Sequence, residues 1–271
     1  MPTLRQRPAE RSPLRLTVEY DGTAFCGFQW QPDVRTVTGV MEAALSVLFG
    51  GPVKIAGAGR TDAGVHATGQ VVSFLPARDF PWDRFLIAIN TLLPADLRVR
   101  VAEFVQAGFS ARFSALERTY VYALLDRDAP SALLARYAYH VRRRLDVDAM
   151  RAAAAHVVGE HDFRSFCGIP PAGPGGPGPT VRTVRRLEVE RRGDLVRVEI
   201  AANGFLHRMV RTIVGTLAEC GDGRRPPGEL PAIVAARARE SAGHSAPAHG
   251  LYLAGVRYED GYDSYAEPPL F

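Results

Sequence analysis

The sequence predicts an α+β fold of two pseudo-symmetric lobes, each an antiparallel sheet with helices on one face. Two observations lead to this fold class. Segments with strand-like and helix-like periodicity alternate along the chain, and the second half repeats the kinds of element found in the first. A chain of 271 residues is also long enough for two modest hydrophobic cores. Because ligands often bind between lobes, we expect a central cleft.

The domain organisation follows from where these patterns begin and end. We divide the chain into a basic N-terminal arm (1–13), an N-terminal α+β lobe (14–110) and a C-terminal α+β lobe (111–271). The arm contains arginine and proline, and we expect it to precede the first strand. The N-terminal lobe also carries a glycine-rich loop, AGAGRTDAGVHATGQ, between two expected strands.

The elements of the N-terminal lobe follow from their periodicity. Alternation of apolar and polar residues predicts a strand, and apolar residues spaced by three or four predict a helix. Gly50 and Gly51 end the first helix, and Pro81 lies at the start of the second. In chain order we expect strand 14–20, helix 37–49, strands 53–56 and 70–75, helix 81–92 and strand 98–105.

The C-terminal lobe repeats this mixture. Asp146 is a suitable N-cap for a helix, and the Pro/Gly-rich run 167–180 is expected to form no regular structure. In chain order we expect strand 118–125, helix 146–158, a hairpin over 181–202 that turns at 192–194, helix 204–221, a further helix and loop over 228–246 and a last strand over 250–260.

The charge balance is mildly basic, with a formal net charge of +4 and a pI near 9.1. Lys54 is the only lysine, so arginine supplies nearly all of the positive charge. Arginine binds phosphate bidentately and stacks on bases, which favours a nucleic-acid partner. A GC-rich genome would give the same bias, and composition alone does not separate these explanations.

Several protein classes are not expected. The sequence has no apolar run of about 18 residues, the length that a membrane span requires. Its N-terminal residues lack the apolar segment of a secretory signal, so we expect the cytoplasm. Cys26, Cys167 and Cys220 are far apart and form no CxxC pair, so neither a disulfide framework nor a metal site is expected.

The glycine-rich loop does not fit the common phosphate-binding motifs. After Gly57-x-Gly59, a dinucleotide fingerprint needs a glycine where Asp62 stands, and a strand follows in place of a helix. Gly59-x4-Gly64 has the spacing of a P-loop but is followed by Val-His, not Lys and Ser or Thr. An aspartic-protease turn would require a second copy, which the sequence lacks.

What remains is a carboxylate, Asp62, in a loop whose backbone can approach a ligand closely. Arg60 lies two positions earlier, and in an extended loop both side chains project to one side. A neighbouring guanidinium keeps a carboxylate ionised and nucleophilic. Asp62 can equally stabilise its own turn, with Arg60 in a surface ion pair, and the spacing leaves both interpretations open.

Five segments of the sequence, in order, resemble the TruA-type tRNA pseudouridine synthase family. The match is long and contiguous in the glycine-rich loop, and together the segments cover nearly the whole chain from Tyr20 to Leu253. The segments are YDGTAFCGFQWQP, GAGRTDAGVHA, RFSALERTYVY, NGFLHRMVRTIVGTL and HGLYL.

The resemblance implies roles for four residues. Asp62 would be the catalytic nucleophile, and Arg60 would help to flip the target nucleotide. Tyr120 would contact the target base, and Arg211 would pair with the catalytic carboxylate. From the residues alone, Tyr120 can also be a packed strand aromatic, and Arg211 can lie on the polar stripe of its helix.

The resemblance also implies the reaction and the assembly. Family members are cofactor-free homodimers with a pseudouridine synthase fold and a central RNA-binding cleft. They isomerise uridines at positions 38, 39 and 40 of the tRNA anticodon stem-loop. This sequence departs from the family pattern at His249, before GLYL, and in the Pro/Gly-rich loop 167–180, a loop that can alter tRNA contacts. A non-catalytic tRNA-binding protein is the rival interpretation, which the basic balance and the loop aromatics also fit.

Other residues carry weaker predictions. Phe25, Phe28 and Trp30 can stack on RNA, pack in the core or face a second protomer. His66 and His207 are expected to be structural. Groups of arginines can follow tRNA phosphates or form a solvated charged face: Arg142, Arg143, Arg144, Arg182, Arg185, Arg186, Arg191 and Arg192.

Overall fold

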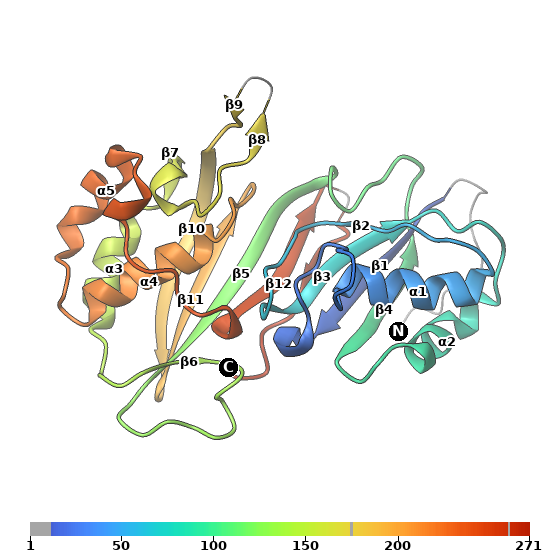
Figure 1. Cartoon of the computed structure of the whole chain (residues 1–271), viewed down its shortest axis with the longest axis horizontal. Coiled ribbons are helices and arrows are strands. Elements are labelled where there is room, and N and C mark those ends of the chain that lie inside the picture. Colours follow the sequence, from blue (N-terminus) through green and yellow to red (C-terminus); the bar gives the residue numbers. More distant parts are fainter. Residues whose placement is uncertain (1–11, 174–175, 260) are drawn as a thin grey trace. The chain divides into compact units, whose positions relative to one another are not determined.

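The computed structural model describes residues 12–173, 176–259 and 261–271 (Figure 1). Most of the predicted N-terminal arm, residues 1–11, lies outside the described residues. The chain forms two compact units. Unit 1 comprises residues up to Leu116 together with Leu253–Glu267, and unit 2 comprises Glu117–Tyr252 together with Pro268–Phe271. The segment 253–267, which the sequence analysis placed in the C-terminal lobe, thus belongs to the first unit.

Unit 1 contains an antiparallel sheet with the strand order β4-β1-β3-β12. Short strands extend it, with β2 paired to β3 and β13 paired to β12. Leu14, Leu16 and Val18 of the central strand are fully buried and form part of the core. The strands are β1 (Leu14–Tyr20), β2 (Ala56–Gly57), β3 (His66–Phe74), β4 (Leu97–Phe104), β12 (Leu251–Tyr258) and β13 (Ser264–Tyr265).

Two helices, α1 (Val37–Phe49) and α2 (Phe85–Leu92), cover one face of this sheet (Figure 1). The Thr36 hydroxyl accepts a hydrogen bond from the Gly39 amide at the start of α1, and Gly50 ends the helix with a φ of 67°. The predicted bounds of α1 are confirmed. The second predicted helix begins as a 3-10 turn at residues 82–84.

Unit 2 contains a second antiparallel path, β5-β11-β10-β7. The predicted hairpin is confirmed, and Gly193 supplies the left-handed residue of its turn with a φ of 65°. One short strand, β6, pairs with β5 in parallel. The strands are β5 (Ala115–Asp126), β6 (Tyr139–Val141), β7 (Gly159–Asp162), β10 (Val181–Arg192) and β11 (Leu195–Ala202).

Helices α3 (Val147–Ala155) and α4 (Met209–Gly221) lie on one face of the unit 2 sheet (Figure 1), and α5 (Leu230–Ala236) follows. The Asp146 carboxylate accepts hydrogen bonds from two amides at the start of α3, which confirms its predicted N-cap role. The prediction that α4 begins at residue 204 is wrong. Arg208 adopts a left-handed conformation with a φ of 59°, so the helix begins after it.

Three other predicted elements differ from the structure. The Pro/Gly-rich run was expected to be irregular, but β8 (Ala172–Gly173) and β9 (Gly176–Pro177) pair as a two-stranded sheet. The predicted strand 53–56 is reduced to β2, because the amide of Ile55 bonds to the Glu42 carboxylate and not to a strand. Strand β3 begins at residue 66, four residues before its predicted start.

Short 3-10 turns complete the described structure. No helix in the described part of the chain is long and apolar enough to span a bilayer. The turns are η1 (Gly22–Ala24), η2 (Trp82–Arg84), η3 (Phe163–Phe166), η4 (Pro227–Glu229), η5 (Arg239–Ser241) and η6 (Ala248–Gly250).

Candidate functional site

The Asp62 carboxylate lies on a tight turn between β2 and β3 in unit 1. The Val65 amide donates a hydrogen bond to the Asp62 carbonyl at 3.2 Å, which closes the turn. Gly64, the third residue of the turn, has a φ of 78°, as a type II turn requires. Asp62 is half-buried, whereas Ala63 and Arg60 are exposed. We call residues 59–65 the Asp62 turn.

A second segment, residues 21–36, lies against the Asp62 turn, and we call it the bracing loop. The Phe28 amide donates to the Thr61 carbonyl at 3.0 Å, and the Gly64 amide donates to the Phe25 carbonyl at 3.3 Å. Gly27 approaches so closely that a Cβ at this position would lie 3.0 Å from the Thr61 carbonyl oxygen. The backbone around Asp62 is therefore held from outside by another backbone segment.

Gly22 and His66 form a further contact between these segments. The Gly22 amide donates to Nδ1 of His66 at 3.0 Å, and the imidazole is buried. The Asp21 carboxylate oxygen Oδ1 lies 3.2 Å from the same Nδ1. A Cβ at Gly22 would lie 2.0 Å from the Val65 carbonyl oxygen. The prediction that His66 is structural agrees with this position.

The flanks of the Asp62 turn are bonded to the strands of unit 1. The hydroxyls of Tyr20 and Thr61 are 2.8 Å apart, and burial raises the pKa of Tyr20 to about 12, so it stays protonated. The Gln70 side-chain amide donates to the Gly59 carbonyl at 2.9 Å. Side chains on β1 and β3 therefore fix both sides of the turn.

In unit 2, Tyr120 lies on β5 opposite Ile200 of β11. Its side chain is buried, with 7% of the residue exposed, and its ring packs edge-on against Phe205 with centroids 5.0 Å apart. This environment is that of a packed strand aromatic. It also holds the ring in a fixed orientation, which a base-contacting residue requires.

Arg211 lies in the first turn of α4 and is half-buried. Its Nε–H donates to the Ala246 carbonyl at 2.7 Å, and its own carbonyl accepts from the Ala246 amide at 2.9 Å. The positive charge of Arg211 also acts on Tyr122 and His249. Burial raises the pKa of Tyr122 well above its ordinary value and lowers that of His249, and Arg211 opposes the first shift and adds to the second.

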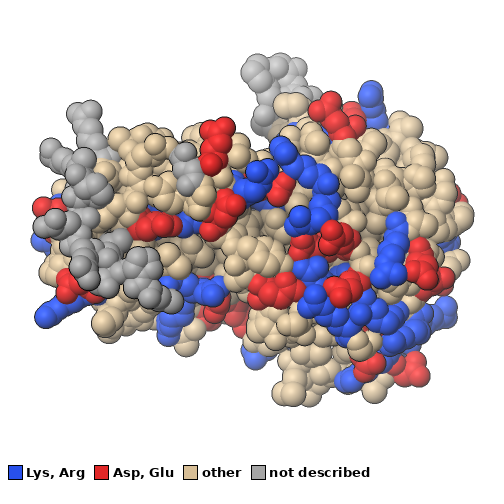
Figure 2. Space-filling view, turned by 180° about the vertical axis from the view of Figure 1, so that it is seen from behind, with Lys and Arg blue, Asp and Glu red and all other residues tan. Residues whose placement is uncertain are grey.

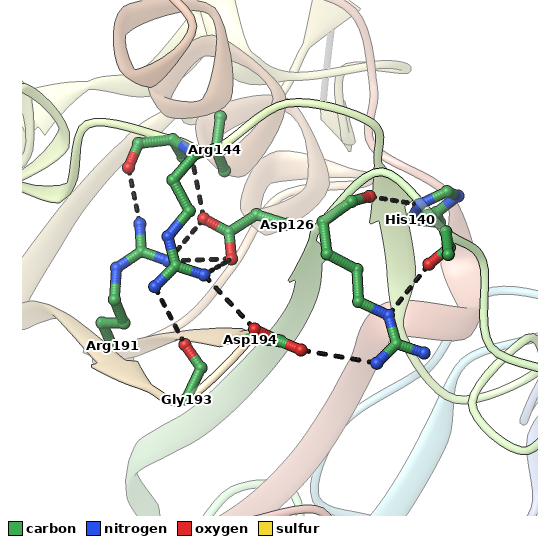
Figure 3. Close-up of polar contacts among 9 residues, drawn as sticks. Asp126, His140, Arg144, Arg191, Gly193 and Asp194 are labelled. Atoms are coloured by element: carbon green, nitrogen blue, oxygen red, sulfur yellow. Dashed lines mark hydrogen bonds and ion pairs between the residues drawn. The ribbon is translucent and has the colours of Figure 1, made fainter.

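The predicted arginine patch is largely neutralised by carboxylates. Arg191 bonds both oxygens of the fully buried Asp126, at 2.8 and 2.6 Å, and Arg144 lies 3.5 Å from Asp126 and from Asp194 (Figure 3). Figure 2 shows basic and acidic side chains interspersed on one face of the molecule. The other ion pairs of this set are Arg185 with Glu117, Arg186 with Glu199 and Arg192 with Glu190.

These contacts favour a structural or solvated role for most of the predicted patch.

The aromatic residues of the bracing loop also separate into two groups. Phe25 and Phe28 are buried, whereas Trp30 is 53% exposed. His207 is half-buried, and its carbonyl accepts a hydrogen bond from the Gly168 amide at 2.9 Å. Among residues 12–173, 176–259 and 261–271, no cluster of three His, Cys, Asp or Glu side chains is arranged to hold a metal ion.

The sequence analysis missed the residues that support the Asp62 turn. Asp21, Gly22 and Thr61 lie inside two of the matched segments, yet no role was assigned to them. The signal available was the pair of glycines in YDGTAFCGF, because a glycine permits a close backbone approach. Which backbone they approach follows only from the fold.

Comparison with known proteins identifies the family. A family model described as tRNA pseudouridine synthase matches residues 16–114 and 153–259. The chain belongs to the tRNA pseudouridine synthase family. As a member of this family it is an isomerase that acts on tRNA. The matched segments of this synthase include Arg60, Asp62 and Arg211, and Tyr120 lies between them.

Three proteins named tRNA pseudouridine synthase A illustrate the similarity. The Brevibacillus brevis protein is 48% identical over 245 residues, which cover 90% of this synthase and 99% of that protein. The Halalkalibacterium halodurans protein is 46% identical, with 87% and 89% covered, and the Bacillus subtilis protein is 42% identical, with 91% and 99% covered. A chain from a Cbf5-Nop10-Gar1 crystal structure aligns with a TM-score of 0.33, at 12% identity, over 75% of this synthase and 53% of that chain.

Proposed function

We propose that this synthase converts uridine to pseudouridine at positions 38, 39 and 40 of the tRNA anticodon stem-loop, with Asp62 as nucleophile and without a cofactor. One observation carries the proposal. The backbone on both sides of Asp62 is fixed by hydrogen bonds with the bracing loop, so the position of its Cα atom is set before substrate binds. Such preorganisation is what a nucleophile requires and what an ordinary surface turn does not need.

The chemistry suits a single carboxylate. The N1–C1′ glycosidic bond breaks, the uracil turns, and a C5–C1′ bond forms. The proton leaves C5 and N1 gains one, so atoms and electrons balance without a redox partner or a group donor. Asp62 can attack the sugar, attack the base or assist glycal formation, and it can later move the proton. The proposal covers the carboxylate and leaves these three routes open.

Three other residues have proposed roles at the same nucleotide. A stacked uridine must leave its helix, at a cost of a few kcal/mol, before Asp62 can reach it. Arg60, an exposed residue of the Asp62 turn, would fill the space left behind and bond the neighbouring backbone. Tyr120, held edge-on by Phe205, would contact the extruded base. Arg211, oriented by the Ala246 carbonyl, would pair with the Asp62 carboxylate.

We also propose that the synthase is a homodimer, as the family resemblance implies, and that it works in the cytoplasm. Neither property is needed for the carboxylate chemistry, so each has its own test. Light scattering of the purified protein measures the oligomeric state, and a mass of one chain, 29.5 kDa, would contradict a dimer. Fractionation of cells that contain the tagged chain would test its location.

Tritium release from tRNA that carries 5-tritiated uracil tests the proposed nucleophile. We expect wild-type protein to release tritium and Asp62→Asn to release none. Asp79→Asn is a matched control, because Asp79 is an exposed carboxylate in the same unit. Unchanged release by Asp62→Asn would refute the role of Asp62, and wild-type protein that binds tRNA without release would indicate a binding protein. Mapping pseudouridines in tRNA from a strain that lacks the gene would test positions 38 to 40.

A further inference from the structure

The tip of the bracing loop presents an aromatic side chain to solvent. Residues 29–34 are all exposed, and Trp30 is the one aromatic residue among them. The chain has two tryptophans. Trp82, the other, is 5% exposed and packs among Phe49, Phe80 and Phe104. Half of a large indole is thus left in water on a loop that touches the Asp62 turn, where the proposed chemistry takes place.

The loop that carries Trp30 is closed at its base by hydrogen bonds. The Cys26 amide donates to the Arg35 carbonyl at 2.8 Å, and the Gln31 side-chain amide donates to the Cys26 carbonyl at 3.0 Å. Beyond the tip, the Val37 amide donates to the Gly27 carbonyl at 3.1 Å. The tip is therefore a short, cross-linked projection and not a long free loop.

The indole itself rests against helix α1. A Cβ at Gly39 would lie 3.4 Å from Cδ1 of Trp30 and 4.0 Å from its Nε1. These are van der Waals distances, so the edge of the indole lies beside the first turn of the helix. One edge of the ring is thus supported while more than half of the residue stays exposed, so little side-chain freedom remains to be lost on binding.

The backbone connects Trp30 to the proposed nucleophile by a short path. Trp30 lies two residues after Phe28, whose amide bonds the carbonyl of Thr61, the residue before Asp62. Three Cα–Cα steps of about 3.8 Å and one hydrogen-bonded pair about 5.5 Å apart place the Cα atoms of Trp30 and Asp62 within roughly 17 Å of each other. That separation suits a nucleotide close to the target.

We propose that Trp30 stacks on an unpaired base of the tRNA near the uridine that Asp62 attacks. The inference rests on the proposed role of Asp62, and it adds a binding residue to it. Proteins recognise unpaired RNA by stacking bases on aromatic side chains, and an indole is a large face for this purpose. The exposed Arg60, within the Asp62 turn, supplies positive charge for the phosphates of the same strand.

Intrinsic fluorescence tests the contact directly, because the two tryptophans differ in exposure. We expect unmodified tRNA transcript to quench the emission of wild-type protein in a saturable manner. Trp30→Phe retains only Trp82, and its emission should stay constant apart from light absorption by the RNA. Wild-type emission that is unchanged at tRNA concentrations where filter binding detects the complex would overturn the proposal. Emission that shifts with protein concentration in the absence of RNA would overturn it too, since a second copy would then cover Trp30.

Binding measurements give the size of the contact. We expect Trp30→Ala to weaken tRNA binding by about 5- to 150-fold, the range for one base stacked on an aromatic ring, and Trp30→Phe to weaken it much less. Ile87→Ala is the matched control, because Ile87 is a 74% exposed apolar residue on α2 of the same unit. These binding measurements do not depend on turnover. An active Asp62→Asn enzyme would refute the role of Asp62 as nucleophile and would leave the stacking result unchanged. Equal binding by Trp30→Ala and wild type would overturn the stacking proposal.

A set of abasic transcripts tests the position of the partner base. One base at a time is removed from the loop around the target uridine, and each transcript is bound to wild type and to Trp30→Ala. The two proteins should bind equally well to the transcript that lacks the base contacted by Trp30, because the stacking interaction is already lost there. An undiminished effect of Trp30→Ala at every loop position would overturn a contact near the target.

Discussion

The two units of the molecule hold their proposed functional residues in different ways. In unit 1, Asp62 lies on an irregular turn whose backbone groups bond to the backbone of the bracing loop. In unit 2, Tyr120 lies within a strand and Arg211 within a helix, so the backbone of each is held by regular structure. There, side-chain contacts to Phe205 and to the Ala246 carbonyl set the final orientation.

Because of this difference, we expect the two sites to be sensitive to different kinds of substitution. A turn has no hydrogen-bond ladder of its own, so its buried amides need partners from elsewhere and the approach must be close. The activity that depends on the site in unit 1 should therefore change most when a side chain is added where two backbone segments meet, or when a hydrogen-bond acceptor is removed. The site in unit 2 should respond most to changes in side-chain chemistry. The following changes test each side of this comparison.

The largest effect is expected from Gly22→Ala. Its Cβ would lie 2.0 Å from the Val65 carbonyl oxygen, a main-chain atom that cannot move without moving the Asp62 turn. We expect a fall of about 1–3 kcal/mol in the free energy of unfolding, the range for overpacking, and loss of most tritium release. Gly51→Ala is the control, because no atom lies within 4 Å of the added Cβ. Wild-type turnover in Gly22→Ala would show that the bracing loop does not position Asp62.

Arg211→Lys tests the side-chain requirement in unit 2. Lysine keeps the charge but lacks the planar guanidinium, whose Nε–H donates to the Ala246 carbonyl. We expect kcat to fall on the order of 100-fold, as for a misplaced catalytic contact, while thermal unfolding changes little. Arg224→Lys, in a surface pair with Asp222 of the same unit, should leave kcat unchanged. Equal kcat for both variants would argue against a specific role for Arg211.

His66→Leu and His66→Asn form a matched pair for the contact to Gly22. Leucine removes the acceptor of a buried amide hydrogen bond, which should lower the free energy of unfolding by about 1–3 kcal/mol. Asparagine offers an oxygen close to the position of Nδ1 and should recover part of that loss. In tritium release we expect kcat to fall for leucine while KM for tRNA stays constant. Identical behaviour of the two variants would exclude the hydrogen bond as the cause.

The smallest effect concerns His249 and pH. Burial, and then the charge of Arg211, lower the pKa of this imidazole below its usual 6.5, whereas the Ala138 backbone raises it. The unfolded chain then binds a proton more readily than the folded chain, so stability is present above about pH 6.5 and decreases as pH falls through the lowered pKa. We expect His249→Gln to reduce the loss of unfolding free energy between pH 7 and pH 5, measured by denaturant titration. An identical pH profile would contradict the buried neutral form.

Much of the fold could be predicted because its elements are amphipathic and bounded by recognisable residues. Helix α1 has apolar periodicity between a threonine cap and a glycine stop, and the β10–β11 hairpin has alternation around Gly193. The start of α4 could not be predicted, since nothing in FLHRMV marks Arg208 as left-handed. Strand β3 extends to His66 because Ala67 pairs with Tyr20 of β1, a tertiary effect that local pattern does not encode.

The same distinction applies to the candidate site. Three of the family-like segments contain Asp62, Arg60, Tyr120 and Arg211. The roles of these residues came from the resemblance and stay predictions. Tracking of tRNA phosphates by the arginine groups also stays a prediction, and the carboxylates that pair with several of these arginines could not be predicted because they lie on other strands. Asp126 on β5, for example, is 65 residues from Arg191 on β10, and the two are brought together because β11 pairs with both of these strands.

Because residues 253–267 belong to unit 1, this unit cannot complete its fold until the end of the chain has been synthesised. Strand β12 contributes to the sheet beside β3, and the Ser264 hydroxyl bonds the carbonyl of Gly69, nearly two hundred residues earlier. The N-terminal two-fifths of the chain emerge first, yet their sheet stays incomplete until almost the last codon has been read. The part of the β3 edge that pairs with β12 therefore stays unpaired while unit 2 is translated, and an unpaired strand edge is a template for aggregation.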